Sequence, residues 1–288
     1  MNQEPHAGHD VNRWGVPLRY AVALARLDSE LRDCFLAGQL DGEGEAFLVS
    51  TLERNHSTWG LRIRRLLSRF LSDFSANALL GMYPVFLLST PQAQALLEAL
   101  HPNGSSERRL LDVGPGSGDV TTRLTPLVQS VDCTETSYFM ARRLRRRGFN
   151  CWLGPVGEGN AGDPLARSPG YDVICLFNVI DRVARPRRLL EALVAHLPPE
   201  GTLLLSLPLP YDPFFYAGAV THAPEERLRI DAEDWEDALG QLWRRELQPL
   251  GLVPGAVMRV PYLSGGDADH AAYVLDSAVL ALRKVVDR

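Results

Sequence analysis

The sequence lacks the features of several common protein classes. No apolar run approaches the roughly 20 residues that span a bilayer, and the N-terminus has no basic-then-apolar signal pattern. Positive charge is not in excess, since 30 Lys and Arg residues are outnumbered by 35 Asp and Glu residues and the net charge is −5. Overall charge therefore disfavours nucleic acid as a partner. We expect no membrane partner and a soluble, cytoplasmic protein, with an organelle as the alternative.

Cysteine is scarce and scattered. The four cysteines are Cys34, Cys133, Cys151 and Cys175. None belongs to a C-x-x-C pair, so neither a zinc site nor a redox motif is indicated, and we expect no metal. Two of them, Cys133 and Cys175, fall in predicted strands, where we expect buried free thiols.

The most informative stretch is 110–119, LLDVGPGSGD. An apolar run ends at Asp112, and Gly114, Gly116 and Gly118 follow at every second position. This pattern predicts a strand, a tight turn and a helix start, because glycine adopts φ > 0 and lets a ligand approach the backbone. Such a turn at the carboxyl end of a parallel strand binds nucleotide-like ligands. The G-x-G-x-G spacing differs from that of dinucleotide folds, and it resembles motif I of class I S-adenosylmethionine (SAM)-dependent methyltransferases.

Alternating strands and helices are predicted around this stretch. The expected strands cover 109–113, 130–135, 150–153, 171–177 and 201–207. The expected helices of the same region cover 120–126, 137–147, 186–197 and 231–247, the last one capped by Asp231. Two closing strands, near 256–260 and 272–282, have no helix between them. The order predicts an α/β fold: a doubly wound, Rossmann-like sheet with an antiparallel C-terminal hairpin edge.

The first third of the chain is predicted to be helical. Apolar residues at helical spacing favour helices over 17–37, 45–53, 59–80 and 90–100, the last one capped by Thr90. We therefore divide the chain into a flexible tail (1–15), a helical N-terminal extension that caps the core (16–108) and a SAM-dependent methyltransferase domain (109–288). Arginine runs at 62–69 and 142–147 are interpreted as solvated helix faces rather than RNA contacts.

Two acidic positions follow predicted strand ends. Glu135 lies about twenty residues after the glycine-rich turn, where a carboxylate can bind the ribose of a nucleotide cofactor. Its alternative role is to balance a helix dipole. Asn178 and Asp181 follow the strand expected at 171–177 and could point into the same crevice. Alternatively they form a polar turn in which Asp181 caps a helix or pairs with Arg182. The Asn/Asp-Pro-Pro-aromatic motif of nucleic-acid amino-methyltransferases is absent, which disfavours adenine or cytosine N-methylation.

Several segments together resemble one family. They are 110–114 with Gly118-Asp119, Thr134-Glu135, 178–182 (NVIDR), 207–211 (LPLPY), 261–263 (PYL) and 273–276 (YVLD). From Gly60 to its C-terminus the chain resembles the DREV family of protein histidine methyltransferases, also called methyltransferase-like protein nine. The resemblance implies methyl transfer from SAM to the π (Nδ1) nitrogen of histidine, at His-x-His sequences of a protein or peptide with a small middle residue.

The resemblance also implies site residues. The cofactor-binding residues are Asp112, Gly114, Gly116, Glu135, Asn178 and Tyr262. The catalytic residues are Asp181, Tyr273 and Asn178. Asp181 and Tyr273 would hold the substrate imidazole, with Asp181 accepting its Nε2–H so that the Nδ1 lone pair is free. The connection over 208–230, rich in proline and aromatic residues, would form the lip for a peptide.

Three alternatives remain open. The first is a SAM-dependent methyltransferase of a small molecule or RNA, which would close the lip over a buried pocket. The second is a non-catalytic binding protein with a methyltransferase fold, although Asp112, Glu135, Asn178 and Asp181 are all present. The third is a nicotinamide-dependent dehydrogenase, for which the glycine spacing is wrong. The sequence leaves the oligomeric state open.

Overall fold

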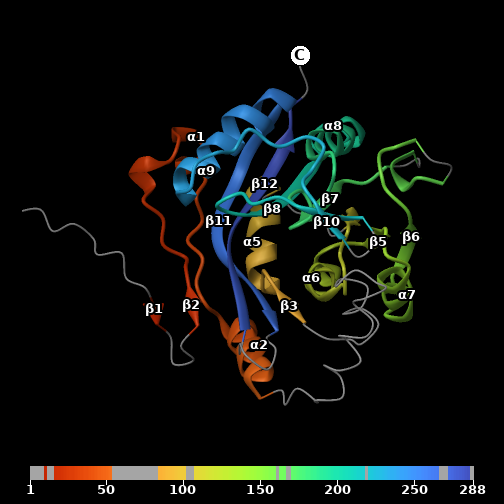
Figure 1. Ribbon diagram of the computed structural model, residues 1–288, viewed down its shortest axis with the longest axis horizontal. Coiled ribbons are helices and arrows are strands. Elements are labelled where there is room, and N and C mark those ends of the chain that lie inside the picture. Colours follow the sequence, from red (N-terminus) through yellow and green to blue (C-terminus); the bar gives the residue numbers. More distant parts are fainter. Residues whose placement is uncertain are drawn as a thin grey trace, which may run out of the picture.

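The computed structural model describes residues 10–11, 16–53, 84–101, 107–159, 162–166, 170–217, 220–265 and 272–285. Within them, an eight-stranded sheet organises the chain (Figure 1) in the order β3-β11-β12-β8-β7-β4-β5-β6. The strands are β3 (Val85–Phe86), β4 (Arg109–Val113), β5 (Ser130–Glu135), β6 (Asn150–Leu153), β7 (Val173–Phe177), β8 (Thr202–Pro208), β11 (Leu252–Gly265) and β12 (Ala272–Lys284).

The strand order is that of a doubly wound sheet. Strands β4 to β8 are mutually parallel. The chain runs outward from β4 through β5 to β6 and then returns to β7 on the other side of β4. The order therefore reverses between β4 and β7, which is where open α/β sheets bind their ligands. Strand β12 is antiparallel to both β8 and β11, so the predicted C-terminal hairpin is confirmed.

Helices cover both faces of the sheet. One face packs against α5 (Thr90–Leu100) and α6 (Asp119–Leu124), and the other against α8 (Pro186–His196) and α9 (Trp235–Leu242). Helix α7 (Tyr138–Arg146) packs beside β5 and β6. Because both faces are buried, the central strands are nearly continuous apolar runs, such as VICLF in β7 and TLLLSLP in β8. Cys133 and Cys175 are buried free thiols, as predicted.

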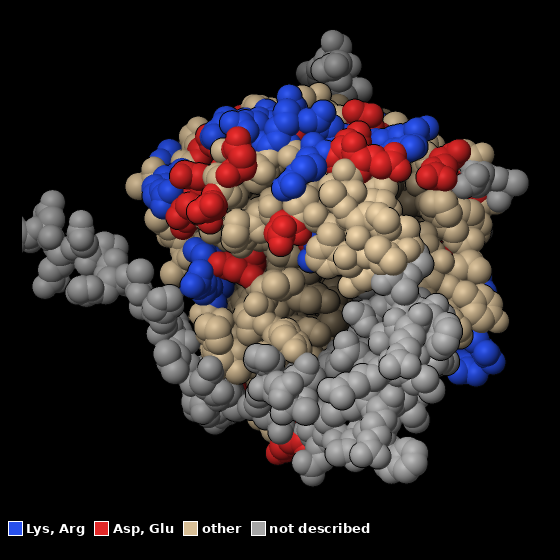
Figure 2. All heavy atoms as spheres, in the orientation of Figure 1, with Lys and Arg blue, Asp and Glu red and all other residues tan. Residues whose placement is uncertain are grey.

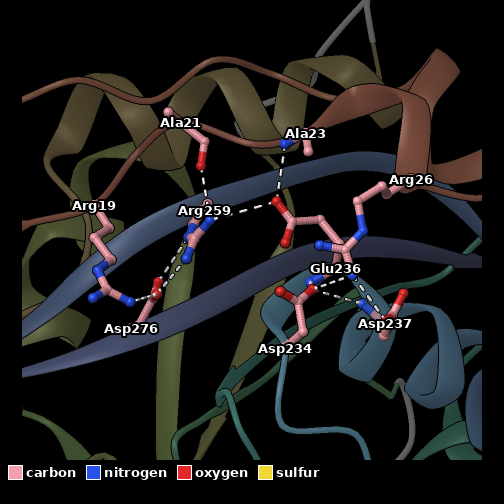
Figure 3. A network of polar contacts seen from close by, with 9 residues as sticks. All are labelled: Arg19, Ala21, Ala23, Arg26, Asp234, Glu236, Asp237, Arg259 and Asp276. Carbon is pink, nitrogen blue, oxygen red and sulfur yellow. Dashed lines mark hydrogen bonds and ion pairs between the residues drawn. The ribbon is translucent and has the colours of Figure 1, made fainter. Parts of the chain in front are cut away.

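The predicted helix over 17–37 is wrong. The segment contains β2 (Pro17–Leu18), a 3₁₀ turn (Leu24–Arg26) and the short α1 (Ser29–Asp33). Its backbone groups bond to the C-terminal half of the chain instead of to a helical turn (Figure 3). Arg259 Nη1 donates to the Ala21 carbonyl at 2.8 Å, and the Ala23 N–H donates to Glu236 Oε1 at 2.9 Å.

The same segment continues along β11. The Val257 N–H donates to the Cys34 carbonyl at 3.0 Å, and the Leu36 N–H donates to the Val257 carbonyl at 2.8 Å. Two ion pairs also connect the segment to the C-terminal half of the chain (Figure 3). Arg19 Nη1 lies 3.7 Å from Asp276 Oδ2, and Arg26 Nη2 lies 2.9 Å from Asp234 Oδ1. Residues 19–36 therefore form a strap across the hairpin and α9 rather than an amphipathic helix.

Element boundaries differ from prediction in smaller ways. Ser89, not Thr90, caps α5 through a capping box with Gln92, and Asp234, not Asp231, caps α9. A helix at 42–52 (α2) agrees with the expected 45–53. Most of the predicted tail, the predicted helix over 59–80 and the arginines at 62–69 lie outside the described residues. The proposed domain boundaries stay a prediction.

Candidate active site

The predicted site residues stand along one edge of the sheet. Strands β4, β5 and β7 end there, and β11 also ends there because it runs parallel to β8. The edge therefore gathers the turn after β4, the end of β5, the loop after β7 and the end of the hairpin where β11 stops and β12 begins. Figure 2 shows the surface hollowed near the centre of this view, in the region where Figure 1 draws β3 and α6.

The glycine-rich turn after β4 needs its glycines for different reasons. Gly114, Gly116 and Gly118 have φ of 67°, 58° and 78°, a region that other residues adopt only with strain. A Cβ on Gly114 would lie 2.9 Å from Val179, and one on Gly118 would lie 2.7 Å from Leu144. A Cβ on Gly116 would meet nothing within 4 Å. Gly116 therefore faces open space, in which a ligand can approach the backbone.

Glu135 is fixed against this turn. Its Oε2 accepts the Gly116 N–H at 3.2 Å, and its Oε1 accepts the Ser137 N–H at 2.9 Å. The side chain is buried, and burial raises the pKa of the carboxyl although the backbone hydrogen bonds lower it. Each oxygen of a carboxylate can accept more than one hydrogen bond. Thr136 bonds to the same carboxylate, so a hydroxyl of a ligand beside Gly116 would share these oxygens with the protein's own donors.

Asp112 is turned into the fold. Its Oδ2 accepts the Thr121 hydroxyl at 2.7 Å, which links β4 to the helix after the turn, while its Oδ1 is buried without a partner. Burial raises the pKa of this carboxyl to about 7. Because this bond joins the strand before the turn to the helix after it, Asp112 positions the turn.

Asp119, which the sequence analysis did not assign, also positions the turn. Its carboxylate accepts the Ser117 hydroxyl at 2.7 Å, Arg147 Nη1 at 2.7 Å and the Val85 N–H at 3.2 Å. These bonds tie the turn to α7 and β3. The signal that could have found it is an acid at the first position of a helix after a glycine-rich turn.

The loop after β7 holds Asn178 under strain. Asn178 has φ of 53°, which is rare for a residue other than glycine. Its Oδ1 accepts the Ser206 hydroxyl from β8 at 2.7 Å, and its Nδ2 is buried without a partner. Backbone strain of this kind clusters at functional sites. Ser206 is a further positioning residue, and no local pattern of the sequence indicates it.

Asp181 is the most buried acid of this loop, with 2% exposure. Its Oδ2 lies 2.6 Å from Arg182 Nη1, so the predicted pairing of these neighbours exists. Its Oδ1 is buried and has no hydrogen-bond partner. Burial raises the pKa of Asp181, while the Arg182 guanidinium lowers it.

The hairpin contributes the two predicted tyrosines. Tyr262 on β11 is half-buried, and its pKa is raised first by burial and then by the carboxylates of Asp181 and Asp119. The register pairs Tyr262 with Leu275 and Ser264 with Tyr273, so both tyrosines lie on one face of the hairpin. Tyr273 is more exposed than Tyr262, with 42% of its surface accessible.

An open cavity of about 850 Å³ lies between residues 210–211, residues 227–233 and Arg245, and none of the predicted site residues lines it. Tyr211 lines it, and its buried hydroxyl has no hydrogen-bond partner. Burial raises the pKa of Tyr211 to about 12, and Asp181 adds to the shift. Strands β9 (Phe215–Ala217) and β10 (Val220–His222) form a small hairpin in the same connection. Both the hairpin and Tyr211 belong to the connection that was predicted as the lip.

Unpaired buried polar atoms occur near the site. Such atoms are rare in folded proteins and point to a missing partner. Three of the nine such side-chain atoms in the described residues belong to the loop after β7 and the predicted lip, namely Asn178 Nδ2, Asp181 Oδ1 and the Tyr211 hydroxyl. Together with the open face of Gly116 and the acceptors of Glu135, they fit SAM, which carries hydroxyl, amino and carboxylate groups. No group of three metal-ligating side chains occurs in the described parts of the chain.

The sheet order, the glycine-rich turn at the switch point and the acid at the end of β5 define a class I methyltransferase. A family model described as DREV methyltransferase matches residues 20–284. The chain belongs to the DREV methyltransferase family, and its cofactor is SAM. No described helix has the length and apolar character required to cross a membrane.

Solved structures of methyltransferases are similar at low identity. The CurJ carbon methyltransferase is 14% identical, with a TM-score of 0.48 over 87% of this chain and 73% of that one. The N-methyltransferase NodS from Bradyrhizobium japonicum WM9, in complex with S-adenosyl-L-homocysteine, is 15% identical, with a TM-score of 0.38 over 67% and 86%. The 1,6-didemethyltoxoflavin-N1-methyltransferase from Burkholderia thailandensis is 18% identical, with a TM-score of 0.41 over 68% and 78%.

Proposed function

We propose that this protein is a protein histidine methyltransferase that methylates the Nπ (Nδ1) nitrogen of histidine in His-x-His sequences. Family membership supplies the reaction class. The observation that carries the proposal is Asp181, a carboxylate with 2% exposure whose Oδ1 has no partner at the edge where the site residues gather. A buried carboxylate oxygen without a partner favours a substrate that donates an N–H.

The chemistry needs orientation more than a strong base. SAM supplies, when bound, an electrophilic methyl group on a sulfonium. A neutral imidazole, with a reference pKa of about 6.5, is already nucleophilic near neutral pH. Asp181 accepts the Nε2–H of the target imidazole, which fixes the tautomer and leaves the Nδ1 lone pair free. The negative charge of Asp181 also stabilises the imidazolium that forms when Nδ1 gains the methyl group.

The remaining residues hold the reactants in place. Glu135 and Asn178 offer acceptor and donor groups to the cofactor, and Tyr262 lies near both Asp181 and Asp119. Tyr273, on the same face of the hairpin, would pin the imidazole or the neighbouring histidine.

Substitution of Asp181 tests this assignment. Asp181→Ala should lower the rate with a His-x-His peptide by about a hundredfold or more, as the loss of one preorganised transition-state group does. SAM affinity should change by less than about threefold, because this carboxylate is assigned to the substrate. The matched control is Asp237→Ala on α9, an exposed acid paired with Arg26, which should change neither quantity. Equal losses of rate and SAM affinity in Asp181→Ala would contradict the assignment.

A further inference from the structure

Arg182 is built into the site more tightly than a surface arginine. Its Nη1 lies 2.6 Å from Asp181 Oδ2 and donates to the Asp181 carbonyl at 2.9 Å and the Asp212 carbonyl at 3.2 Å. Its guanidinium carbon lies 3.9 Å from the centre of the Phe214 ring. The Phe214 N–H donates to the Asp181 carbonyl at 3.0 Å. Arg182 is therefore held at several points between the loop after β7 and the lip.

These contacts determine which oxygen of Asp181 lacks a partner. Because Arg182 pairs with Oδ2, the oxygen left without a partner is Oδ1, which is buried. A flexible cation could move between the two oxygens. The movement of Arg182 is restricted by its bonds to the two carbonyls and by its stacking on the Phe214 ring. The Phe214 ring in turn packs edge-on against Tyr216, with 5.6 Å between the ring centroids. The stack connects the orientation of the carboxylate to the β9–β10 hairpin.

We propose that Arg182 is a positioning residue that holds Asp181 ionised and turned with Oδ1 toward the substrate, and that it links this orientation to the peptide lip. The inference rests on the proposed function for the identity of the substrate. The effect of Arg182 on the ionisation of Asp181 involves only residues of this protein, so it is measurable without a substrate.

The groups around Asp181 give the direction of the effect. Burial and the nearby Asp212 both raise the pKa of Asp181, and Arg182 is the cation that lowers it. Tyr211 and Tyr262 are neutral neighbours whose own pKa values are raised by the Asp181 charge as well as by burial. Removal of the guanidinium therefore leaves Asp181 with burial and a like charge, and its pKa must rise.

The test is a titration of Asp181 by carboxyl ¹³C NMR in the full-length protein, with the resonance assigned by its loss in Asp181→Asn. Arg182→Met should raise the midpoint of Asp181 by about 1 pH unit or more. Arg182→Lys should restore much of the shift, and it keeps the test interpretable if the methionine variant does not fold. Arg185→Met is the matched control, because Arg185 pairs with exposed Glu225. It should leave the midpoint unchanged.

Peptide methylation adds a second readout. In Arg182→Met, kcat/KM should fall by about tenfold to a hundredfold. The loss should be larger at acidic than at alkaline pH, because the protonated fraction of Asp181 rises. An Asp181 midpoint that is the same in wild type, Arg182→Met and Arg182→Lys would overturn the inference, whatever the activity. A raised midpoint in a protein that methylates no histidine would support the role of Arg182 and refute the proposed function.

Discussion

Alanine substitutions in the glycine-rich turn should separate folding from cofactor binding. Gly116 and Gly118 have similar backbone conformations, with φ of 58° and 78°. Their surroundings differ. A Cβ on Gly118 would lie 2.7 Å from Leu144 Cδ2 and 3.4 Å from the Phe149 ring, and Leu144 is fully buried. A Cβ on Gly116 would enter open space.

The two variants should therefore differ in stability. A left-handed conformation costs an alanine about 1–2 kcal/mol, and this cost applies to both positions. Overpacking against a buried leucine adds about 1–3 kcal/mol, and this second cost applies to Gly118 alone. We expect Gly118→Ala to lower the free energy of unfolding by about 2–5 kcal/mol. Gly116→Ala should lower it by about 1–2 kcal/mol.

The order reverses for the cofactor. The methyl group of Gly116→Ala projects into the space where a ligand can approach the backbone, and SAM affinity should fall by more than tenfold. Denaturant unfolding and isothermal titration with SAM measure the two effects on the same protein. Gly118→Ala as stable as Gly116→Ala would refute the packing argument. Unchanged SAM affinity in Gly116→Ala would refute the placement of the cofactor beside this turn.

Three further predictions concern buried charges and the strained loop. Arg259→Met should destabilise the protein by about 3–5 kcal/mol in denaturant unfolding, because it leaves the buried Glu236 without its cation and leaves the partly buried Asp276 only the more distant Arg19. The half-exposed Arg26→Met should cost less than about 1 kcal/mol. Burial raises the pKa of Asp112 in the folded state to about 7, above the 3.8 of an ordinary aspartate carboxyl. Between these two values the folded state holds a proton that the unfolded state loses, so the free energy of unfolding of the cofactor-free protein should fall as pH rises. Asp112→Asn should flatten this dependence on pH, and a variant that keeps the wild-type slope would contradict the prediction. Ser206→Ala removes the bond to Asn178 and should weaken SAM binding in calorimetry by about tenfold, and wild-type affinity would contradict the role of Asn178.

The α/β core was predictable because its signals are local. The apolar runs of β4 and β7 are bounded by polar residues, and both strands were placed within two residues of their ends. The glycine spacing and the acid at the end of β5 predicted two partners that the structure joins, since Glu135 accepts the Gly116 N–H. The carboxyl ends of parallel strands lie at the same edge of the sheet, so the residues that follow these ends come close together regardless of how the helices pack.

The strap and the second half of the site depend on contacts distant in sequence. Residues 17–37 have helical apolar spacing, but Ala21 and Ala23 bond to residues more than 200 positions away, and these bonds replace helical ones. Strand β11 extends from Leu252 to Gly265, although Pro254 and Pro261 interrupt the strand pattern, because it pairs with β12 along its length. No local pattern shows that Ser206 holds Asn178.

The most direct test of the proposed function is mass spectrometry of a peptide carrying Ala-His-Ala-His after incubation with the protein and SAM. We expect one added methyl group per modified histidine, located on Nπ by fragmentation against methylhistidine standards, and its loss in Asp181→Ala. Bound SAM without methylated histidine, or a methyl group on the other ring nitrogen, would contradict the account.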